Sequence, residues 1–314
     1  MAYFLALDIG GTKTDYLLAD ETSELARVRT GTIKRMKLDE VTTEANLASA
    51  LRQLTEISGV SMQSITRCCI GTAGESVPLV TDWLRGAFAR HVGGDLHLIG
   101  DVEIALDAAF HGKRGVLVLA GTGSNAAGRA ATGSIITAGG WGPLMADQGS
   151  GHFLGLESLR RGFLAIDRQV PTRVLDAARD YWKLGSLGEL IELANANPAP
   201  DFSRLAPLVV ACAEEGDPIA LEVIKQGGAD LAYLAGLVIE RLRRLEASEA
   251  DSQKPFVVPA VAIAGSILEQ VVPVRRAMEA HLRKQYPGIS FVEAPADPPG
   301  GALWNARQGN GLAK

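Results

Sequence analysis

Two short polar loops, each directly after an apolar run, contain residues suited to binding an anion. The first loop is Asp8-Ile-Gly-Gly-Thr-Lys-Thr14, and the second is Gly121-Thr-Gly-Ser-Asn125. Glycines let the backbone turn tightly and bring its N–H groups close to a ligand, and the hydroxyl and amide side chains add further donors. Both loops are therefore predicted to hold phosphate.

The second loop has two alternative interpretations. Gly121-x-Gly123-x-x-Ala126 satisfies a loose dinucleotide fingerprint. That fingerprint requires a helix at the last small residue and an acidic residue about 20 positions later, whereas residues 127–137 have the pattern of strand, glycine turn and strand. A plain hairpin turn remains the structural alternative. A Walker-type loop is excluded because the chain has no Gly-x-x-x-x-Gly-Lys-Ser/Thr.

Two carboxylates at predicted strand ends are candidates for metal and proton chemistry. Asp8 closes an apolar run and could hold a hydrated Mg²⁺, while Lys13 either neutralises phosphate charge or is simply solvated. Asp101 lies between a predicted strand, 96–99, and a predicted helix, 102–110. It could accept the proton of an attacking hydroxyl group, and its structural alternative is a helix cap.

Trp141 and Asp147 have side chains that could contact a ligand. Trp141 lies among glycines in Gly139-Gly-Trp-Gly142, where its ring has an exposed face to offer. Asp147 could accept a hydrogen bond from a ligand hydroxyl. The structural alternatives are core packing for Trp141 and a turn role for Asp147.

Apolar periodicity places these residues on alternating strands and helices, which is typical of an α/β protein. The two loops form similar hairpins about 110 residues apart, which indicates an internal duplication. A domain boundary is predicted at 112–115, giving lobes of 1–114 and 115–297. Predicted strands are 3–7, 15–19, 25–30, 66–70, 96–99, 116–119, 257–264 and 289–292, and predicted helices are 41–57, 79–90, 102–110, 149–167, two within 171–195, 217–246 capped by Asp217, and 302–308.

Composition narrows the class of function. A chain of 314 residues predicts two domains, and a net charge of -5 with 21% charged residues disfavours nucleic acid and anionic membranes as partners. The early Asp8 and the absence of a basic leader predict a cytoplasmic protein. The three cysteines, Cys68, Cys69 and Cys212, have neither disulfide-framework nor metal-site spacing and are predicted to be buried thiols.

The motifs, taken in order, resemble the actin/hexokinase/heat-shock ATPase superfamily. Within it the chain most resembles the BadF/BadG/BcrA/BcrD group, which includes N-acetylglucosamine and glucosamine kinases. The motifs that carry the resemblance are Asp8-Ile-Gly-Gly-Thr12, Gly71-Thr-Ala-Gly74, Asp101, Gly121-Thr-Gly-Ser-Asn125, Gly139-Gly-Trp-Gly142, Asp147-Gln-Gly-Ser150 and Ala264-Gly265-Ser266.

The resemblance implies a two-domain actin-like (ribonuclease H-like) α/β fold with a cleft between the lobes, and a terminal segment, 298–314, that packs back on the first lobe. It implies an ATP-dependent, Mg²⁺-dependent kinase acting on an amino sugar, with a homodimer as the default assembly. The implied ATP and phosphate ligands are Gly10, Gly11, Thr12, Lys13, Thr14, Gly121, Thr122, Gly123, Ser124, Asn125, Gly265 and Ser266, with Asp8 for the metal through water. The implied sugar ligands are Gly71, Thr72, Ala73, Gly74, Asp101, Trp141, Gly142 and Asp147, and Asp101 is the implied catalytic base.

The chain departs from the group's usual pattern at two places. Asp147-Gln148-Gly-Ser replaces Asp-Glu-Gly-Ser, and Gly31-Thr32-Ile33-Lys34-Arg35 stands where the group often carries an Asn that contacts the sugar. The basic pair either recognises an acidic substituent on the sugar or lies on the surface.

Other members of the superfamily supply alternative functions. Kinases with a zinc-binding His/Cys cluster need cysteines that the second half lacks, since only Cys212 lies there. Related repressors need a DNA-binding helix pair before the first loop, and Asp8 leaves no room for it. An iron–sulfur ATPase activator would need interface cysteines, for which Cys68-Cys69 has the wrong spacing. A non-catalytic actin-like module does not account for residues 141–150.

Overall fold

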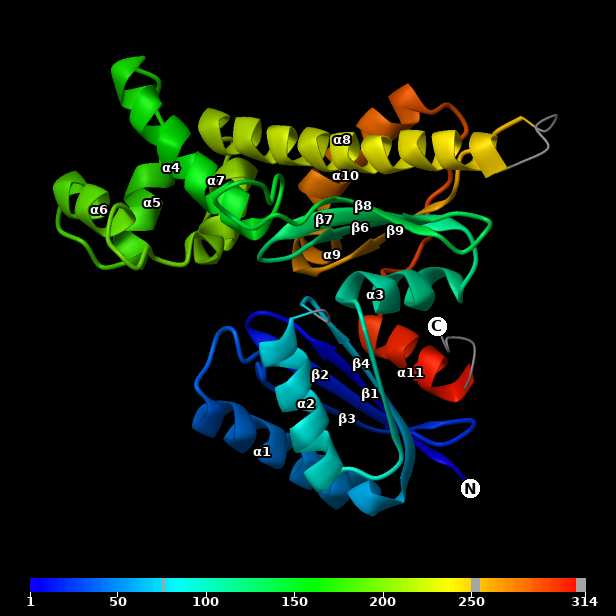
Figure 1. The fold of residues 1–314 in the computed structure, drawn as a ribbon. Helices are drawn as coiled ribbons and strands as arrows, with labels where there is room; N and C mark the ends of the chain where they lie inside the picture. The colour runs from blue at the N-terminus through cyan, green and yellow to red at the C-terminus, as the bar shows by residue number, and fades with distance from the viewer. Residues whose placement is uncertain (75–76, 250–254, 309–314) are drawn as a thin grey trace. The chain divides into compact units, whose positions relative to one another are not determined.

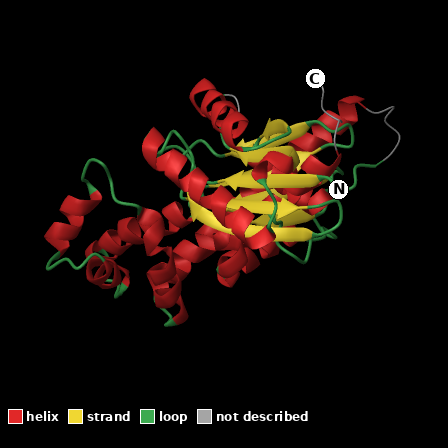
Figure 2. Ribbon diagram, turned by 90° about the horizontal axis from the view of Figure 1, so that it is seen from below, coloured by secondary structure: helices red, strands yellow, loops and turns green. Residues whose placement is uncertain are grey.

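A computed structural model describes residues 1–74, 77–249 and 255–308. The chain divides into two compact units, which are Met1–Arg114 with Ala296–Lys314, and Gly115–Pro295. Each unit has its own sheet flanked by helices (Figures 1 and 2). No helix of the described residues has the length and apolar character needed to cross a membrane.

The first unit is built on a mixed sheet with the strand order β3-β2-β1-β4-β5. The hairpin β1–β2 and the pair β2–β3 are antiparallel, whereas β1–β4 and β4–β5 are parallel. Its elements are β1 (Tyr3–Ile9), β2 (Lys13–Ala19), β3 (Glu24–Gly31), α1 (Glu40–Ser58), β4 (Ile65–Thr72), α2 (Pro78–His91), β5 (Asp95–Ile99), α3 (Asp101–Phe110) and α11 (Pro298–Gln308), with a short 3₁₀ turn at Met62–Ser64.

The central strand β1 is buried on both faces because its side chains alternate between two layers of the core. Leu5 and Leu7 pack with apolar residues of α1 and α2, whereas Phe4 and Ala6 pack with residues of α3 and α11. The sheet of this unit is therefore covered by helices on both sides.

The terminal helix α11 is held to this unit by polar contacts as well as by packing. Arg27 of β3 donates from both Nη atoms to the Asp297 carboxylate, at 2.9 and 2.7 Å, and Asn305 Nδ2 donates to Asp107 Oδ2 at 2.8 Å. Gly301 is required for the close approach, since a Cβ atom there would lie 1.8 Å from the Ile104 carbonyl oxygen of α3. Figure 1 shows α11, in red, beside α3.

The second unit repeats the mixed pairing of the first. Its strand order is β8-β7-β6-β9, in which β6–β7 and β7–β8 are antiparallel and β6–β9 is parallel. Its elements are β6 (Gly115–Ala120), β7 (Ser124–Arg129), β8 (Ile135–Gly139), α4 (Gly151–Asp167), α5 (Val174–Tyr181), α6 (Leu187–Ala194), a 3₁₀ turn (Phe202–Leu205), α7 (Ala206–Glu214), α8 (Pro218–Glu249), β9 (Val261–Ala264), α9 (Ser266–Gln270) and α10 (Val272–Gln285).

The long helix α8 lies across β6, β7 and β8 (Figure 1). As predicted, Asp217 caps it: the Asp217 Oδ1 atom accepts from the N–H groups of Ile219 and Ala220, at 2.9 and 3.0 Å. Pro218 follows at the first helical position, where a missing N–H costs nothing.

The two predicted hairpins and the α/β class are confirmed, and two strand predictions are wrong. The strand predicted at 257–264 is limited to Val261–Ala264, because β6 pairs with only these residues. The strand predicted at 289–292 is reduced to an isolated bridge between Val261 and Phe291. In both segments the apolar residues continue beyond the point where a neighbouring strand provides backbone partners. The apolar pattern therefore predicted longer strands than can form.

The close approach of α11 to α3 predicts a large effect of adding one methyl group. We expect Gly301→Ala to lower the free energy of unfolding by at least about 2 kcal/mol, because its Cβ would meet backbone atoms that cannot rotate away. Urea unfolding measures this change. Gly11→Ala is the matched control, since a Cβ atom on Gly11 meets nothing within 4 Å. Equal stability of the two variants would contradict the packing argument.

Candidate active site

The first loop, residues 8–14, closes the β1–β2 hairpin. The N–H of Gly10 donates to the Lys13 carbonyl at 3.0 Å, and the Thr32 hydroxyl donates to the Gly10 carbonyl at 2.7 Å. Gly11, Thr12 and Lys13 are exposed, whereas Thr14 is buried and its hydroxyl accepts from the N–H of Ile33 at 3.1 Å. Thr14 thus supports the loop from within, and the exposed tip is free to meet a ligand.

Parallel pairing brings several of the predicted residues to one edge of the first sheet. Asp8 is in register with Gly71, and Gly71 with Ile99, so the carboxyl ends of β1, β4 and β5 coincide. Asp101 follows β5 by two residues, and residues 72–74 follow Gly71 directly. The structure therefore gathers Asp8, the 71–74 turn and Asp101 at this edge.

Gly71 sets the position of the helix that carries Asp101. A Cβ atom on Gly71 would lie 2.1 Å from Cδ1 and 2.5 Å from Cγ1 of Ile104. Only a glycine lets α3 pack this closely on β4. Thr72 is fully buried, so among residues 71–74 the half-buried Ala73 and Gly74 are the more open to a ligand.

Asp101 is not the N-cap of α3, contrary to the structural alternative drawn from the sequence. Gly100 occupies the cap position, and Asp101 is the first helical residue. Its Oδ1 atom accepts from the N–H of Val102 at 2.8 Å, and the side chain is half-buried. A carboxylate in the first turn of a helix is stabilised by the positive end of the helix dipole.

Asp8 has an unusual protonation equilibrium. Its pKa is raised to about 7, first by burial and then by the nearby carboxylates of Asp101 and Asp15, while Lys13 lowers it. Asp15 is paired to Arg29 at 2.5 Å and to Lys13 at 3.6 Å. A cation bound next to Asp8 would stabilise its ionised form, because the cation attracts the negative charge that burial and the neighbouring carboxylates disfavour.

The raised pKa of Asp8 predicts how stability depends on pH. The folded protein keeps this proton up to about pH 7, whereas the unfolded chain loses it near 3.8. The folded state binds more protons in that window, so its stability falls as pH rises through it. We expect Asp8→Asn to remove this fall and to raise the Tm at pH 8, without divalent cations, by at least about 2 °C.

Thermal unfolding of both proteins at intervals from pH 5 to pH 8 tests this prediction. The difference in Tm between Asp8→Asn and the unmodified protein should grow with pH. A constant difference across the range would show that Asp8 does not titrate in this window.

The second loop, residues 121–125, is held by the segment 147–152. Within the loop, the N–H of Gly121 donates to the Gly123 carbonyl at 2.9 Å. The N–H groups of Gly151 and His152, at the start of α4, donate to the carbonyls of Gly121 at 2.8 Å and Thr122 at 3.2 Å. The Ser124 hydroxyl donates to the carbonyl of Gln148 at 2.7 Å.

Asp147 also faces this loop. The side chain is buried, its backbone has a φ of 66°, and its Oδ1 atom accepts from the N–H of Ser124 at 3.0 Å. A Cβ atom on Gly123 would lie 2.9 Å from that same carboxylate oxygen. The sequence assigned Asp147 to a sugar, and that role remains a prediction. Its role in positioning the second loop was missed, because Ser124 lies 23 residues away.

Gly265 and Ser266 lie beside the second loop. Gly265 has a φ of 92°, and a Cβ atom there would lie 2.5 Å from the Ala120 carbonyl oxygen. A Cβ atom on Gly121 would be 3.9 Å from the Ser266 hydroxyl. Gly265 and Ser266 therefore lie next to residues 121–125. The family resemblance implies that both groups of residues bind the nucleotide.

Trp141 lies on an exposed turn, which excludes its core-packing alternative. Its exposed fraction is 74%, and the neighbouring Leu144 and Met145 are also exposed. The turn begins next to the second loop, since Gly139 is in register with Asn125. The Oδ1 atom of Asn125 is buried and has no hydrogen-bond partner among the described residues. Among the described residues, this end of the loop therefore has an unsatisfied acceptor.

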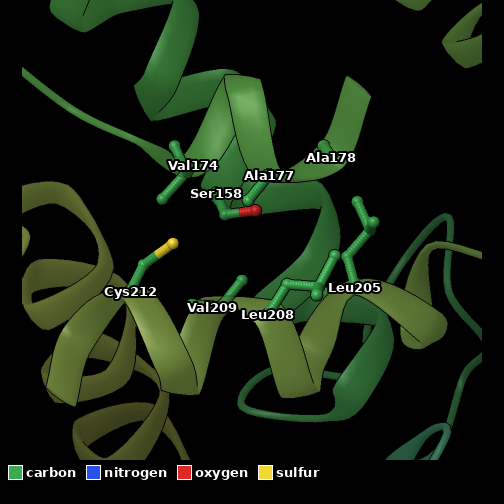
Figure 3. Close-up of a pocket in the computed structure, with 8 residues that line it drawn as sticks. All are labelled: Ser158, Val174, Ala177, Ala178, Leu205, Leu208, Val209 and Cys212. Carbon is green, nitrogen blue, oxygen red and sulfur yellow. The ribbon is translucent and has the colours of Figure 1, made fainter. Parts of the chain in front are cut away.

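The pocket drawn in Figure 3 has a different character. It lies between α4, α5 and α7. Alanine, valine and leucine side chains form most of its lining, and Ser158 and Cys212 supply the hydroxyl and thiol groups. The Ser158 hydroxyl already donates to the Gly155 carbonyl at 2.7 Å, and burial raises the pKa of Cys212. This pocket is part of the packing of the helices rather than a catalytic site.

Two sheets with the same mixed pairing, each with a glycine-containing loop after its central strand, define an α/β protein with the actin-like ATPase fold. The chain belongs to the BadF/BadG/BcrA/BcrD ATPase family, whose sequence profile matches residues 5–305.

Two relatives are similar to this chain over almost the whole length of both proteins. It is 25% identical to the N-acetylmuramic acid/N-acetylglucosamine kinase of Clostridium acetobutylicum, over 98% of this chain and 99% of that protein. It is 26% identical to the N-acetyl-D-glucosamine kinase of Dictyostelium discoideum, over 95% and 96%. A crystal structure of a candidate N-acetylglucosamine kinase from Chromobacterium violaceum matches the fold with a TM-score of 0.73, at 24% identity over 96% of this chain and 98% of that one.

The contact between Asp147 and the second loop can be tested by stability. We expect Asp147→Ala to lower the free energy of unfolding by about 1–3 kcal/mol, because the buried N–H of Ser124 would lose its acceptor. Asp147→Asn should recover most of the loss, since asparagine keeps an oxygen acceptor and tolerates a positive φ. Urea unfolding of both variants measures the difference. Equal losses in the two variants would mean that the hydrogen bond contributes nothing.

Proposed function

We propose that this protein transfers the γ-phosphoryl group of ATP to a hydroxyl group of an amino sugar such as N-acetylglucosamine or glucosamine. The observation that carries the proposal is the gathering of Asp8, the 71–74 turn and Asp101 at one sheet edge, beside an exposed glycine-threonine loop. The full-length similarity to kinases of N-acetylated amino sugars supports this substrate class.

In this proposal the chain's own residues align and stabilise the reactants rather than react covalently. The first loop, residues 10–14, and the second loop, residues 121–125, bind phosphate oxygens, and Gly265 and Ser266 contact the adenosine. The hydrogen bonds from residues 147–152 hold the second loop in place before the nucleotide arrives. Such preorganised donors need no rearrangement when charge develops on the phosphates.

Asp101 is the proposed general base. Its carboxylate accepts the proton of the attacking sugar hydroxyl as the bond to phosphorus forms. Trp141 offers its exposed ring to the C–H face of the sugar, with Gly142 and Asp147 as neighbouring contacts. Residues 71–74 are also proposed as sugar ligands.

Mg²⁺ is the proposed metal, held by Asp8 through water. In the described part of the chain no group of three or more His, Cys, Asp or Glu residues is arranged to hold a metal, and the proposal rests instead on the crowded carboxylate of Asp8. When bound, the ion would neutralise charge on the phosphate oxygens.

The iron–sulfur activator alternative is disfavoured by the placement of its cysteines. Cys68 and Cys69 are buried in β4 and belong to the cores on opposite faces of the sheet. Burial raises the pKa of Cys69 to about 12. Cluster ligands are thiolates presented to the iron, and these thiols are neither ionised nor at a surface.

A coupled ADP-release assay tests the proposed activity. The acceptors to compare are glucosamine, N-acetylglucosamine, N-acetylmuramic acid and glucose. We expect ADP release that depends on the presence of an amino sugar. Mass spectrometry would identify the phosphorylated sugar. Release that does not change on adding any of these acceptors would reject the sugar kinase assignment.

The role of Asp101 predicts a large loss of turnover with an intact fold. We expect Asp101→Ala to lower kcat at least about 100-fold, the usual scale of help from a general base, with little change in the Kd for ATP. Glu103→Ala is the matched control, because Glu103 is the other acid in the first turn of α3. Near-normal turnover of Asp101→Ala would remove it from the mechanism.

A further inference from the structure

A cavity in the first unit lies between the end of α2 and the start of β5. Its volume is about 260 Å³, and the apolar part of its lining comes from Phe88, Ala89, Val92 and Leu96. Cavities for drug-sized ligands span about 300–1,000 Å³. This cavity is therefore suited to a smaller molecule with an apolar body.

The cavity is separate from the candidate active site. Asp95, which begins β5, lines the cavity, whereas Asp101 follows the other end of the strand, Ile99, by two residues. A strand rises about 3.3 Å per residue, so the two ends of β5 are about 13 Å apart. A small molecule in the cavity would leave the carboxyl ends of the strands open.

The turn between α2 and β5 is fixed by close packing against the start of β4. A Cβ atom on Gly93 would lie 2.3 Å from the Gln63 carbonyl oxygen, and one on Gly94, where φ is 71°, would lie 2.2 Å from the Thr66 carbonyl oxygen. The N–H of Gly93 also donates to the Met62 carbonyl at 2.9 Å. These contacts hold one wall of the cavity in place before any ligand arrives.

Two residues of opposite charge, Arg85 of α2 and Asp95 of β5, line the cavity. Both are exposed, and neither side chain has a hydrogen-bond or ion-pair partner among the residues that the structure describes. Arg67 is in register with Asp95, but its Nη1 atom donates to the Ala306 carbonyl at 2.6 Å. The two charges are therefore available to a ligand.

The cation and the apolar residues share one face of α2. Phe88, Ala89 and Val92 follow Arg85 at helical spacing. A guanidinium binds a carboxylate through paired N–H groups, and an aspartate accepts hydrogen bonds from an ammonium group. A ligand that meets both charges and the apolar lining carries one carboxylate, one ammonium group and an apolar body. An α-amino acid with an apolar side chain combines these groups in a small molecule.

We propose that this cavity binds an apolar α-amino acid. Its carboxylate would pair with Arg85 and its ammonium group with Asp95. Its side chain would pack against Phe88 and Leu96.

The proposed ligand is an effector of catalysis, because both walls of the cavity lead to the candidate active site. β5 leads to Asp101, and α2 follows the 71–74 turn, where the N–H of Val77 donates to the Gly74 carbonyl at 2.9 Å. A ligand that restrains α2 and β5 can therefore shift both parts of the site. The effector role rests on the proposed kinase function, whereas the binding site does not.

Isothermal titration calorimetry of the full chain with leucine and with phenylalanine tests the binding site. We expect a Kd below about 1 mM for at least one of them. The analogues that lack the amino group, 4-methylpentanoate and 3-phenylpropanoate, should bind at least about 10-fold more weakly, and so should the amines 3-methylbutylamine and 2-phenylethylamine. Equal affinity for an analogue that lacks either charge would overturn the assignment, as would no binding of either amino acid.

Variants of the lining show whether the ligand occupies this cavity. Arg85→Met and Asp95→Asn should each lower the affinity at least about 10-fold. Ala89→Phe should abolish binding by filling the cavity, and Ala89→Ser is its matched control. Arg52→Met removes an exposed charge from α1 in the same unit and should bind normally. Unchanged affinity of the two charge variants would place the ligand elsewhere and overturn the inference.

The ADP-release assay tests the effector role separately. We expect a saturating amino acid to change kcat or the KM for the sugar by at least about 5-fold, the lower end of usual coupling between sites. Ala89→Phe should remove this response. Binding with unchanged kinetics would overturn the effector role. Absence of ADP release with any acceptor would reject the kinase function, and the calorimetric test of the binding site would still stand.

Discussion

The site depends on the mixed pairing of one central strand in each sheet. β1 and β6 each turn back into an antiparallel hairpin on one side and pair in parallel with a later strand on the other. A hairpin loop and the carboxyl end of a parallel strand are then forced to the same edge of the sheet. For this reason the first loop, the 71–74 turn and Asp101 meet, and the second loop meets Gly265 and Ser266. The chemistry follows from the strand order rather than from any single motif.

The two loops are made rigid by different means. The first is supported by side chains, with the Thr32 hydroxyl and the Thr14 hydroxyl joining it to residues 32–38, here called the basic turn. The second is supported mainly by backbone donors at the start of α4, together with the buried carboxylate of Asp147. A change in the basic turn can therefore reach the first loop directly. The second loop instead depends on how α4 begins, which is fixed by Ser150, whose hydroxyl accepts from the N–H of Phe153 at 3.1 Å.

Charge at the first sheet edge is balanced between opposing groups. Asp15 is neutralised by Arg29 and Lys13, and Asp297 by Arg27. Asp8 is buried and lies near the carboxylates of Asp101 and Asp15, and for these reasons its pKa rises to about 7. The first loop and residues 32–38 lie at the same sheet edge as these carboxylates.

The sequence by itself determined the α/β class, the repeated hairpins, the capping of α8 by Asp217 and the family, because each depends on short-range patterns of apolar, glycine and hydroxyl residues. It did not determine the ends of β9, since a strand extends only where a partner backbone accompanies it. The tertiary structure alone decided that Asp147 faces Ser124 and that Asp101 is inside its helix rather than at the cap. These properties depend on distances between residues that the chain brings together only on folding, and local residue patterns carry no record of those distances.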